Sequence, residues 1–162
     1  MNGDFERALP FVLNIEGGYS DDPNDSGGKT NHGITEAVAR AHGYRGRMED
    51  LSVALAKQWY REDYWDKVRA DEIKWPMCLY LFDAAVQHSP PAAIRLVQAT
   101  LGLAQDAILG PLTLAAVNGM SAEQCGLALA DRAIHYTRLA KFPYYGRGWL
   151  KRMFLMAQES GG

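Results

Sequence analysis

Residues 16–35 read Glu-Gly-Gly-Tyr-Ser-Asp-Asp-Pro-Asn-Asp-Ser-Gly-Gly-Lys-Thr-Asn-His-Gly-Ile-Thr, and they join an amphipathic segment to a polar, glycine-rich loop. The preceding residues, from Phe5 to Ile15, carry apolar side chains at helical spacing, and Gly17 ends that helix directly after Glu16. A carboxylate in the last turn of a helix lies near the negative end of the helix dipole, which opposes its ionisation. With apolar neighbours to desolvate it, Glu16 can stay protonated and donate a proton.

The loop that follows supplies a second carboxylate, Asp25, and a hydroxyl, Thr30. A solvated loop position favours an ionised Asp25, and the hydroxyl of Thr30 can orient a water molecule. Two carboxylates in different environments, with a held water, are typical of glycoside hydrolysis. The sequence also allows a plainer interpretation, in which Asp25 is a turn residue and Thr30 a strand residue.

The composition of the chain limits its possible domain organisation, partners and cofactors. The chain has 162 residues, of which 48% are hydrophobic and 22% charged, and this is ordinary for one globular domain. A net charge of −2 argues against nucleic acid as a partner. Cys78 and Cys125 lie in apolar runs, and no spacing of ligands indicates a metal site, so we expect no metal and no cofactor.

The N-terminus lacks the pattern of a signal peptide, and no apolar run is long enough to insert into a membrane. We therefore expect synthesis in the cytoplasm, with another protein providing passage for any work outside it. Residues 121–157 hold six bases and two acids. This imbalance is either a solvated helix face, the commoner case, or a surface for an anionic polymer.

The pattern predicts a mainly α-helical chain. The first helix has Asp4 as a possible cap, and Pro10 predicts a kink or a late start. A short β-hairpin is expected within Ser26–Ile34. The further helices are expected from Thr35 to His42, from Ser52 to Tyr64, from Met77 to Val86 after Pro76, from Ala92 to Leu101, from Pro111 to Val117, from Ser121 to about Lys141, and from Arg147 onward.

Several motifs together resemble glycoside hydrolase family 108, the lysozyme-like N-acetylmuramidases of phage endolysins and bacterial secretion. The resemblance covers about residues 9 to 152. Its motifs are Glu16-Gly17-Gly18-Tyr19, Pro23-Asn24-Asp25, Gly27-Gly28-Lys29-Thr30, Gly33-Ile34-Thr35, Tyr60 with Tyr64-Trp65-Asp66, Leu81-Phe82-Asp83, Leu96-Val97-Gln98, Gly110-Pro111 and Arg147-Gly148-Trp149-Leu150.

This resemblance implies a lysozyme-like helical domain over residues 1–162 with a small β-hairpin beside the active-site cleft. About residues 1–75 would form the catalytic part, and about residues 76–157 would form a helical part that resembles a peptidoglycan-binding segment. The implied activity is hydrolysis of the β-1,4 bond between N-acetylmuramic acid and N-acetylglucosamine in peptidoglycan. We expect a monomer that reaches the periplasm or cell wall through a separate holin or secretion system.

Glu16 matches the catalytic glutamate of the family. Eight residues separate Glu16 from Asp25, as in the similar phage lysozymes, but four rather than five separate Asp25 from Thr30. The catalytic residues expected are therefore Glu16, Asp25 and Thr30. The substrate-binding candidates are Tyr19, Tyr64, Asp83 and Gln98, with a packing role as the alternative for each.

Two segments depart from the family pattern. Gln87-His88-Ser89 stands where an asparagine and a glycine are usual, and Ala107 replaces a glycine after Asp106. Alanine adopts a positive φ less easily than glycine, so the local loop shape is in question.

Two other functions stay open. A lytic transglycosylase needs the glutamate but no base for water, and a peptidoglycan-binding or secretion-assisting protein needs no turnover.

Overall fold

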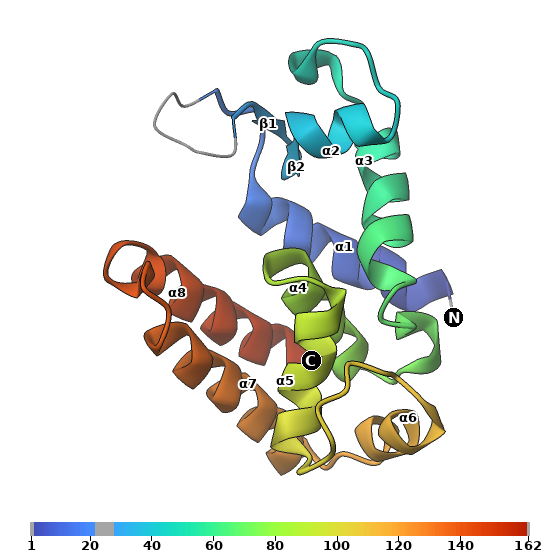
Figure 1. Cartoon of the computed structure of the whole chain (residues 1–162), viewed down its shortest axis with the longest axis vertical. Coiled ribbons are helices and arrows are strands. Elements are labelled where there is room, and N and C mark those ends of the chain that lie inside the picture. The colour runs from blue at the N-terminus through green and yellow to red at the C-terminus, as the bar shows by residue number, and fades with distance from the viewer. Residues whose placement is uncertain (1, 22–27, 162) are drawn as a thin grey trace.

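The chain folds into a mainly α-helical structure with one small sheet (Figure 1). The computed structural model describes residues 2–21 and 28–161, except for the side chains of Asn2 and Glu16. The α-helices in this part are α1 (Asn2–Glu16), α2 (Glu36–Ala41), α3 (Val53–Tyr60), α4 (Met77–Gln87), α5 (Pro90–Thr100), α6 (Pro111–Asn118), α7 (Ala122–Thr137) and α8 (Phe142–Ser160). Shorter turns are η1 (Met48–Asp50), η2 (Arg61–Trp65) and η3 (Ala70–Glu72), of which η2 is a π-helix.

The helix α4 is the centre of the molecule. Its residues from Met77 to Ala85 are all buried, because the sequence there is apolar on every side except at Asp83. Aromatic edge-to-face contacts join it to the N-terminal part: the ring centroids of Phe5 and Phe82 are 5.8 Å apart, and those of Trp65 and Phe82 are 5.4 Å apart. The helices α5, α7 and α8 surround the other side (Figure 1).

The helix α1 runs through Pro10 instead of beginning after it. Since α1 starts at Asn2, the expected late start is wrong. Proline removes one backbone hydrogen bond from a helix interior, but the buried face of α1, which includes Phe5 and Val12, holds the helix against α4 on both sides of Pro10.

Most of the other helix boundaries follow the sequence. Thr35, Ser52 and Ser121 each accept a backbone hydrogen bond as N-caps, and Ser121 forms the expected capping box. The boundary between the last two helices is different from the prediction. The helix α7 ends at Thr137 rather than near Lys141, and α8 begins at Phe142 with a proline in its first turn, where the missing N–H is not needed.

The sheet is a hairpin of two short strands, β1 (Thr30–Asn31) and β2 (Ile34–Thr35). The residues between them, His32 and Gly33, have φ angles of 51° and 74°, as the tight turn of a two-residue hairpin requires. The hairpin lies slightly later in the chain than expected. No helix in the described ranges combines the length and the apolar character that crossing a bilayer demands.

Candidate active site

The end of α1 fixes the position of Glu16. Gly17 has a φ of 80°, and its N–H donates to the carbonyl of Leu13 at 3.1 Å, so the helix stops with Glu16 as its last residue. Glycine adopts this left-handed conformation without the penalty that a Cβ atom brings. The backbone of Glu16 thus lies at the carboxyl end of a 15-residue helix, where the dipole disfavours a negative charge. Its side chain is outside the described part.

The chain returns toward the hairpin after this helix end. Ser20 and Thr30 form an antiparallel bridge in which each N–H donates to the other's carbonyl at 2.9 Å. Thr30 also pairs with Thr35 in the hairpin. Because the backbone groups of Thr30 are engaged, only its half-buried hydroxyl is left for other contacts. Asp25 belongs to the residues between the two ends of this bridge and lies outside the described residues.

Tyr19 stands beside a small charged network on the hairpin side. Its hydroxyl donates to Oε1 of Glu49 at 3.1 Å, while Nε of Arg47 donates to Oε2 of Glu49 at 3.1 Å. Nζ of Lys29 lies 3.5 Å from Oδ2 of Asp21. Desolvation and the hydrogen bond to Glu49 raise the pKa of Tyr19, so the phenol stays protonated. With 41% of its surface exposed, Tyr19 is partly accessible to a ligand.

Tyr64 lies in the π-helix η2, half-buried against Tyr60, with ring centroids 5.8 Å apart. The hydroxyl of Tyr60 donates to the carbonyl of His32 at 2.9 Å and so holds the hairpin turn. Tyr64 therefore contacts Tyr60, the residue that supports the hairpin turn. Single π-helical turns of this kind often occur at functional sites.

Asp83 lies in the protein core, so its expected contact with substrate is wrong. Its side chain is fully buried, and its two oxygens accept from Nη2 of Arg132 at 2.7 Å and from Nε of Arg152 at 2.8 Å. Both arginines are buried as well. A carboxylate with this surrounding cannot reach a glycan on the surface. It balances two buried cations that hold α7 and α8 on α4.

Gln98 is also buried, at 1% exposure, and its expected role in substrate binding is likewise replaced by a structural one. Its amide donates to Oδ1 of Asp106 at 2.8 Å, and its Oε1 accepts from the N–H of Ala107 at 3.1 Å. These bonds hold Ala107 at a φ of 62°, which is unfavourable for alanine. Gln98 therefore fixes the loop before α6.

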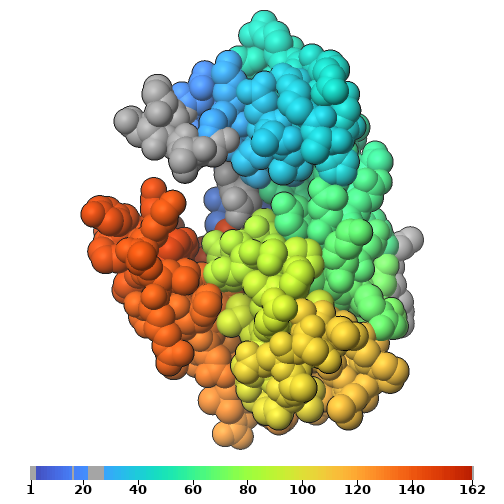
Figure 2. Space-filling model, in the orientation of Figure 1, coloured from blue at the N-terminus to red at the C-terminus, as the bar shows by residue number. Residues whose placement is uncertain are grey.

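The surface is hollowed between the hairpin side and the end of the molecule where α7 meets α8 (Figure 2). Aromatic rings at this end form a ladder that the sequence analysis did not identify. The centroids of His88 and Tyr136 are 5.3 Å apart, those of Tyr136 and Trp149 are 5.2 Å apart, and those of Trp149 and Tyr145 are 5.9 Å apart. Tyr145, the outermost ring, is 56% exposed. The first three rings are too distant in sequence for periodicity to reveal the ladder.

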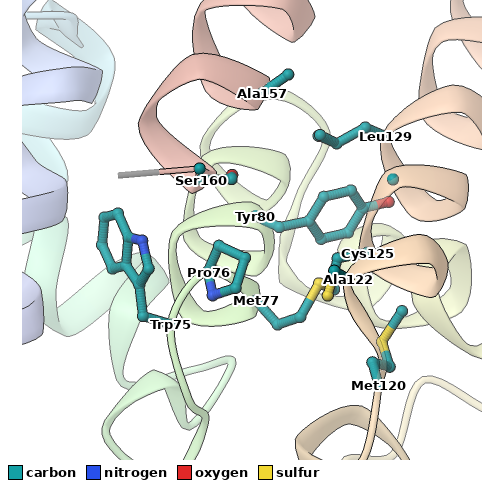
Figure 3. Close-up of a pocket in the computed structure, with 12 residues that line it drawn as sticks. Trp75, Pro76, Met77, Tyr80, Met120, Ala122, Cys125, Leu129, Ala157 and Ser160 are labelled. Carbon is teal, nitrogen blue, oxygen red and sulfur yellow. The ribbon is translucent and has the colours of Figure 1, made fainter.

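A further cavity lies elsewhere in the molecule. It has a volume of about 450 Å³ and lies where α4 begins and α8 ends, with Trp75 and Tyr80 directed toward it and α7 on the far side (Figure 3). Its lining includes Met77, Cys125 and Leu129 and is mainly apolar. The cavity thus lies at the beginning of α4 and the end of α8, whereas the hollow lies near the other end of each helix. The described residues that line this cavity include no acid or base suited to catalysis, and we do not assign the active site to it.

In the described part of the chain, no group of three histidine, cysteine or acidic residues could hold a metal ion. The helix that ends at Glu16, the bridged hairpin and the surrounding helices define the fold class of the protein, a mainly α-helical, lysozyme-like fold.

Comparisons with known proteins agree with this class. The family model described as Glycosyl hydrolase 108 matches residues 9–88, which contain Glu16, Asp25 and Thr30. The solved structure titled "Structure of Brucella abortus SagA" is similar over 99% of this chain and 95% of that chain, with 33% sequence identity and a TM-score of 0.87. A comparison with curated proteins found no match. The chain belongs to the glycosyl hydrolase 108 family, and by this family its substrate is the peptidoglycan of the bacterial cell wall.

Proposed function

We propose that this protein is an N-acetylmuramidase that hydrolyses the β-1,4 bond between N-acetylmuramic acid and N-acetylglucosamine. The observation that supports this most directly is the end of α1. Gly17 stops the helix at Glu16, and the Ser20–Thr30 bridge then returns the chain to the hairpin, so one acid and one hydroxyl are anchored on either side of the segment that carries Asp25.

Glu16 is proposed as the general acid. The carboxyl end of α1 disfavours its charged form, which keeps a proton available for the glycosidic oxygen as the bond breaks. Asp25 is proposed to remain ionised and to assist the attack of a water molecule oriented by Thr30. This arrangement favours inversion. Inverting enzymes separate their two carboxyl groups by about 6.5–9.5 Å, against about 5–5.5 Å in retaining enzymes.

Tyr19 and Tyr64 are proposed to contact the sugar rings. Tyr19 is the stronger candidate, because its hydroxyl is fixed by Glu49 while its ring remains partly exposed. A ring held in this way presents a flat apolar face to a sugar and loses little side-chain entropy on binding. Replacing Tyr19 by alanine should therefore weaken substrate binding more than replacing it by phenylalanine.

The decisive experiment compares Glu16→Gln with the parent on purified sacculi. Loss of a general acid should lower the rate roughly 10²- to 10⁴-fold. Glu123→Gln, an exposed acid on α7, is the matched control and should keep the parent rate. Clearance of sacculi by Glu16→Gln as fast as by the parent would exclude the enzymatic proposal.

The products of the same reaction test the type of cleavage. Hydrolysis leaves reducing N-acetylmuramic acid ends, whereas a lytic transglycosylase leaves 1,6-anhydro ends. We expect reducing ends only, and anhydro ends as the main product would contradict the proposed role of Asp25.

A further inference from the structure

The cavity of about 450 Å³ between α4, α7 and the end of α8 has the size of a small-molecule site. None of the described residues that line it carries a charged side chain. Four lining residues are small and exposed, namely Ala122, Gly126, Ala157 and Gly161, and they leave an opening beside α7 and α8. A small molecule can therefore enter this cavity without crossing the protein core.

Two residues of the lining carry buried donors that are unpaired. Oη of Tyr80 and Nε1 of Trp75 are both covered, and neither has a hydrogen-bond partner in the described part of the chain. Burial raises the pKa of Tyr80, so its hydroxyl stays protonated, and an indole N–H can only donate. Buried donors in folded proteins are nearly always paired, because an unpaired one is destabilising. We therefore expect the acceptor to come from outside the chain.

Both aromatic rings are held in place at the cavity. Tyr80 belongs to the buried part of α4, and Figure 3 shows its hydroxyl directed toward α7. Trp75 lies on the side away from α7, where the guanidinium carbon of Arg7 is 3.8 Å from the ring centroid in a cation–π contact. Met77 and Met120 also line the cavity, and their flexible side chains can move aside so that a ligand reaches a covered donor.

The lining favours an uncharged aromatic ligand. Met77, Met120 and Cys125 bring sulfur atoms to the cavity, and sulfur makes favourable contacts with the edge of an aromatic ring. Burial raises the pKa of the Cys125 thiol, which therefore stays neutral. An ion would lose its hydration here without gaining a counter-ion from the described lining residues, so a charged ligand is disfavoured.

We propose that this cavity binds a small, uncharged aromatic molecule that carries a hydrogen-bond-accepting oxygen. The aromatic ring of the ligand packs against the sulfur-bearing side chains, and its oxygen accepts from the hydroxyl of Tyr80. The N–H of Trp75 offers a place for a second acceptor. The site lies at the beginning of α4 and the end of α8, away from the end of α1, so it does not depend on the proposed function.

Two probes of nearly the same shape test the site. Acetophenone has a carbonyl oxygen, and α-methylstyrene has a CH₂ group in its place. NMR spectra of the methionine methyl groups should show saturable shifts of Met77 and Met120 with acetophenone, whereas Met48, which does not line the cavity, should stay unchanged. If acetophenone moves neither lining methionine, the cavity holds only water and the proposal is wrong.

Tyr80→Phe tests the hydrogen bond. It should weaken the binding of acetophenone about fivefold relative to that of α-methylstyrene, because only acetophenone loses an acceptor contact. The variant should melt at the parent temperature or above it, since an unpaired buried hydroxyl is removed. An unchanged ratio of the two dissociation constants would contradict the assigned anchor. A lower melting temperature would also contradict it, because the hydroxyl would then have a partner within the protein.

A glycine pair tests the location. Gly126→Phe places a ring at the opening, where a Cβ atom meets no other atom within 4 Å, and should abolish the shifts caused by both probes. Gly148→Phe makes the same change on α8 outside the cavity lining, also in open space, and should keep parent binding. Ala157→Leu narrows the same opening from α8 and gives a second blocking variant, should Gly126→Phe fail to fold. A folded blocking variant that binds acetophenone like the parent would overturn the proposal.

Discussion

Asp83→Asn should destabilise this protein more than most single substitutions. The carboxylate accepts hydrogen bonds from Nη2 of Arg132 at 2.7 Å and from Nε of Arg152 at 2.8 Å, and exposure of the three side chains is between 0% and 4%. Asparagine keeps the shape but removes the charge, so the two buried guanidinium groups lose the carboxylate that binds them both. Breaking a buried pair by removing one partner costs about 3–5 kcal/mol, against a typical total stability of about 5–15 kcal/mol.

Urea unfolding followed by circular dichroism measures this loss as the change in the free energy of unfolding. A second variant, Asp83→Leu with Arg132→Met and Arg152→Met, removes all three charges and should recover most of the lost stability, because an apolar replacement avoids the desolvation of ions. Cleavage per folded molecule should be unchanged in Asp83→Asn. A loss below about 1 kcal/mol, or a triple variant as unstable as the single one, would refute the reasoning.

Three further predictions concern stability. Burial and the charge of Arg132 lower the pKa of His88 to about 4, against about 6.5 when unfolded. The unfolded chain therefore binds more protons between these values, and stability should fall by about 2 kcal/mol, allowing for partial exposure, as pH drops from 6.5 to 4. His88→Gln should make the free energy of unfolding less dependent on pH in unfolding measurements at several pH values. An unchanged slope would contradict the role given to His88. Gly126→Ala should raise stability by about 0.5–1 kcal/mol, because a Cβ atom in this helix interior meets no neighbour; a lower melting temperature would show that the glycine is needed. Ala107→Gly should also raise stability by about 0.5–1 kcal/mol, because Ala107 has a φ of 62°, and calorimetry that finds a loss would disprove the strain.

Local signals predicted the helices well, because caps and prolines act within a few residues. The caps at Thr35, Ser52 and Ser121 were all confirmed. The error at the α7–α8 junction has the same local origin. Phe142-Pro143 fits both the break after one helix and the first turn of the next, and only the packing of α8 against α7 decides between them.

Side-chain roles were harder to predict where partners are distant in sequence. Asp83 binds arginines that are 49 and 69 residues away, so no pattern around it distinguishes an acid in a cleft from an acid in the core. Gln98 was misassigned for the same reason, since its partners belong to a loop. The departure from the family pattern at Ala107 could be recognised from the sequence, because the family has a glycine there and glycine adopts a positive φ easily. In the structure Ala107 has a positive φ. The roles of Glu16, Asp25 and Thr30 stay predictions.

The position of α4 explains how the proposed site and the helical scaffold form one unit. Phe82 packs against Phe5 of α1, the helix that ends at Glu16, while the next residue, Asp83, binds the arginines of α7 and α8. Adjacent residues of α4 thus hold both sides of the hollow, and side chains at successive helix positions point in different directions, about 100° apart. The buried charges of Asp83, Arg132 and Arg152 therefore belong to the scaffold on which the proposed site is built.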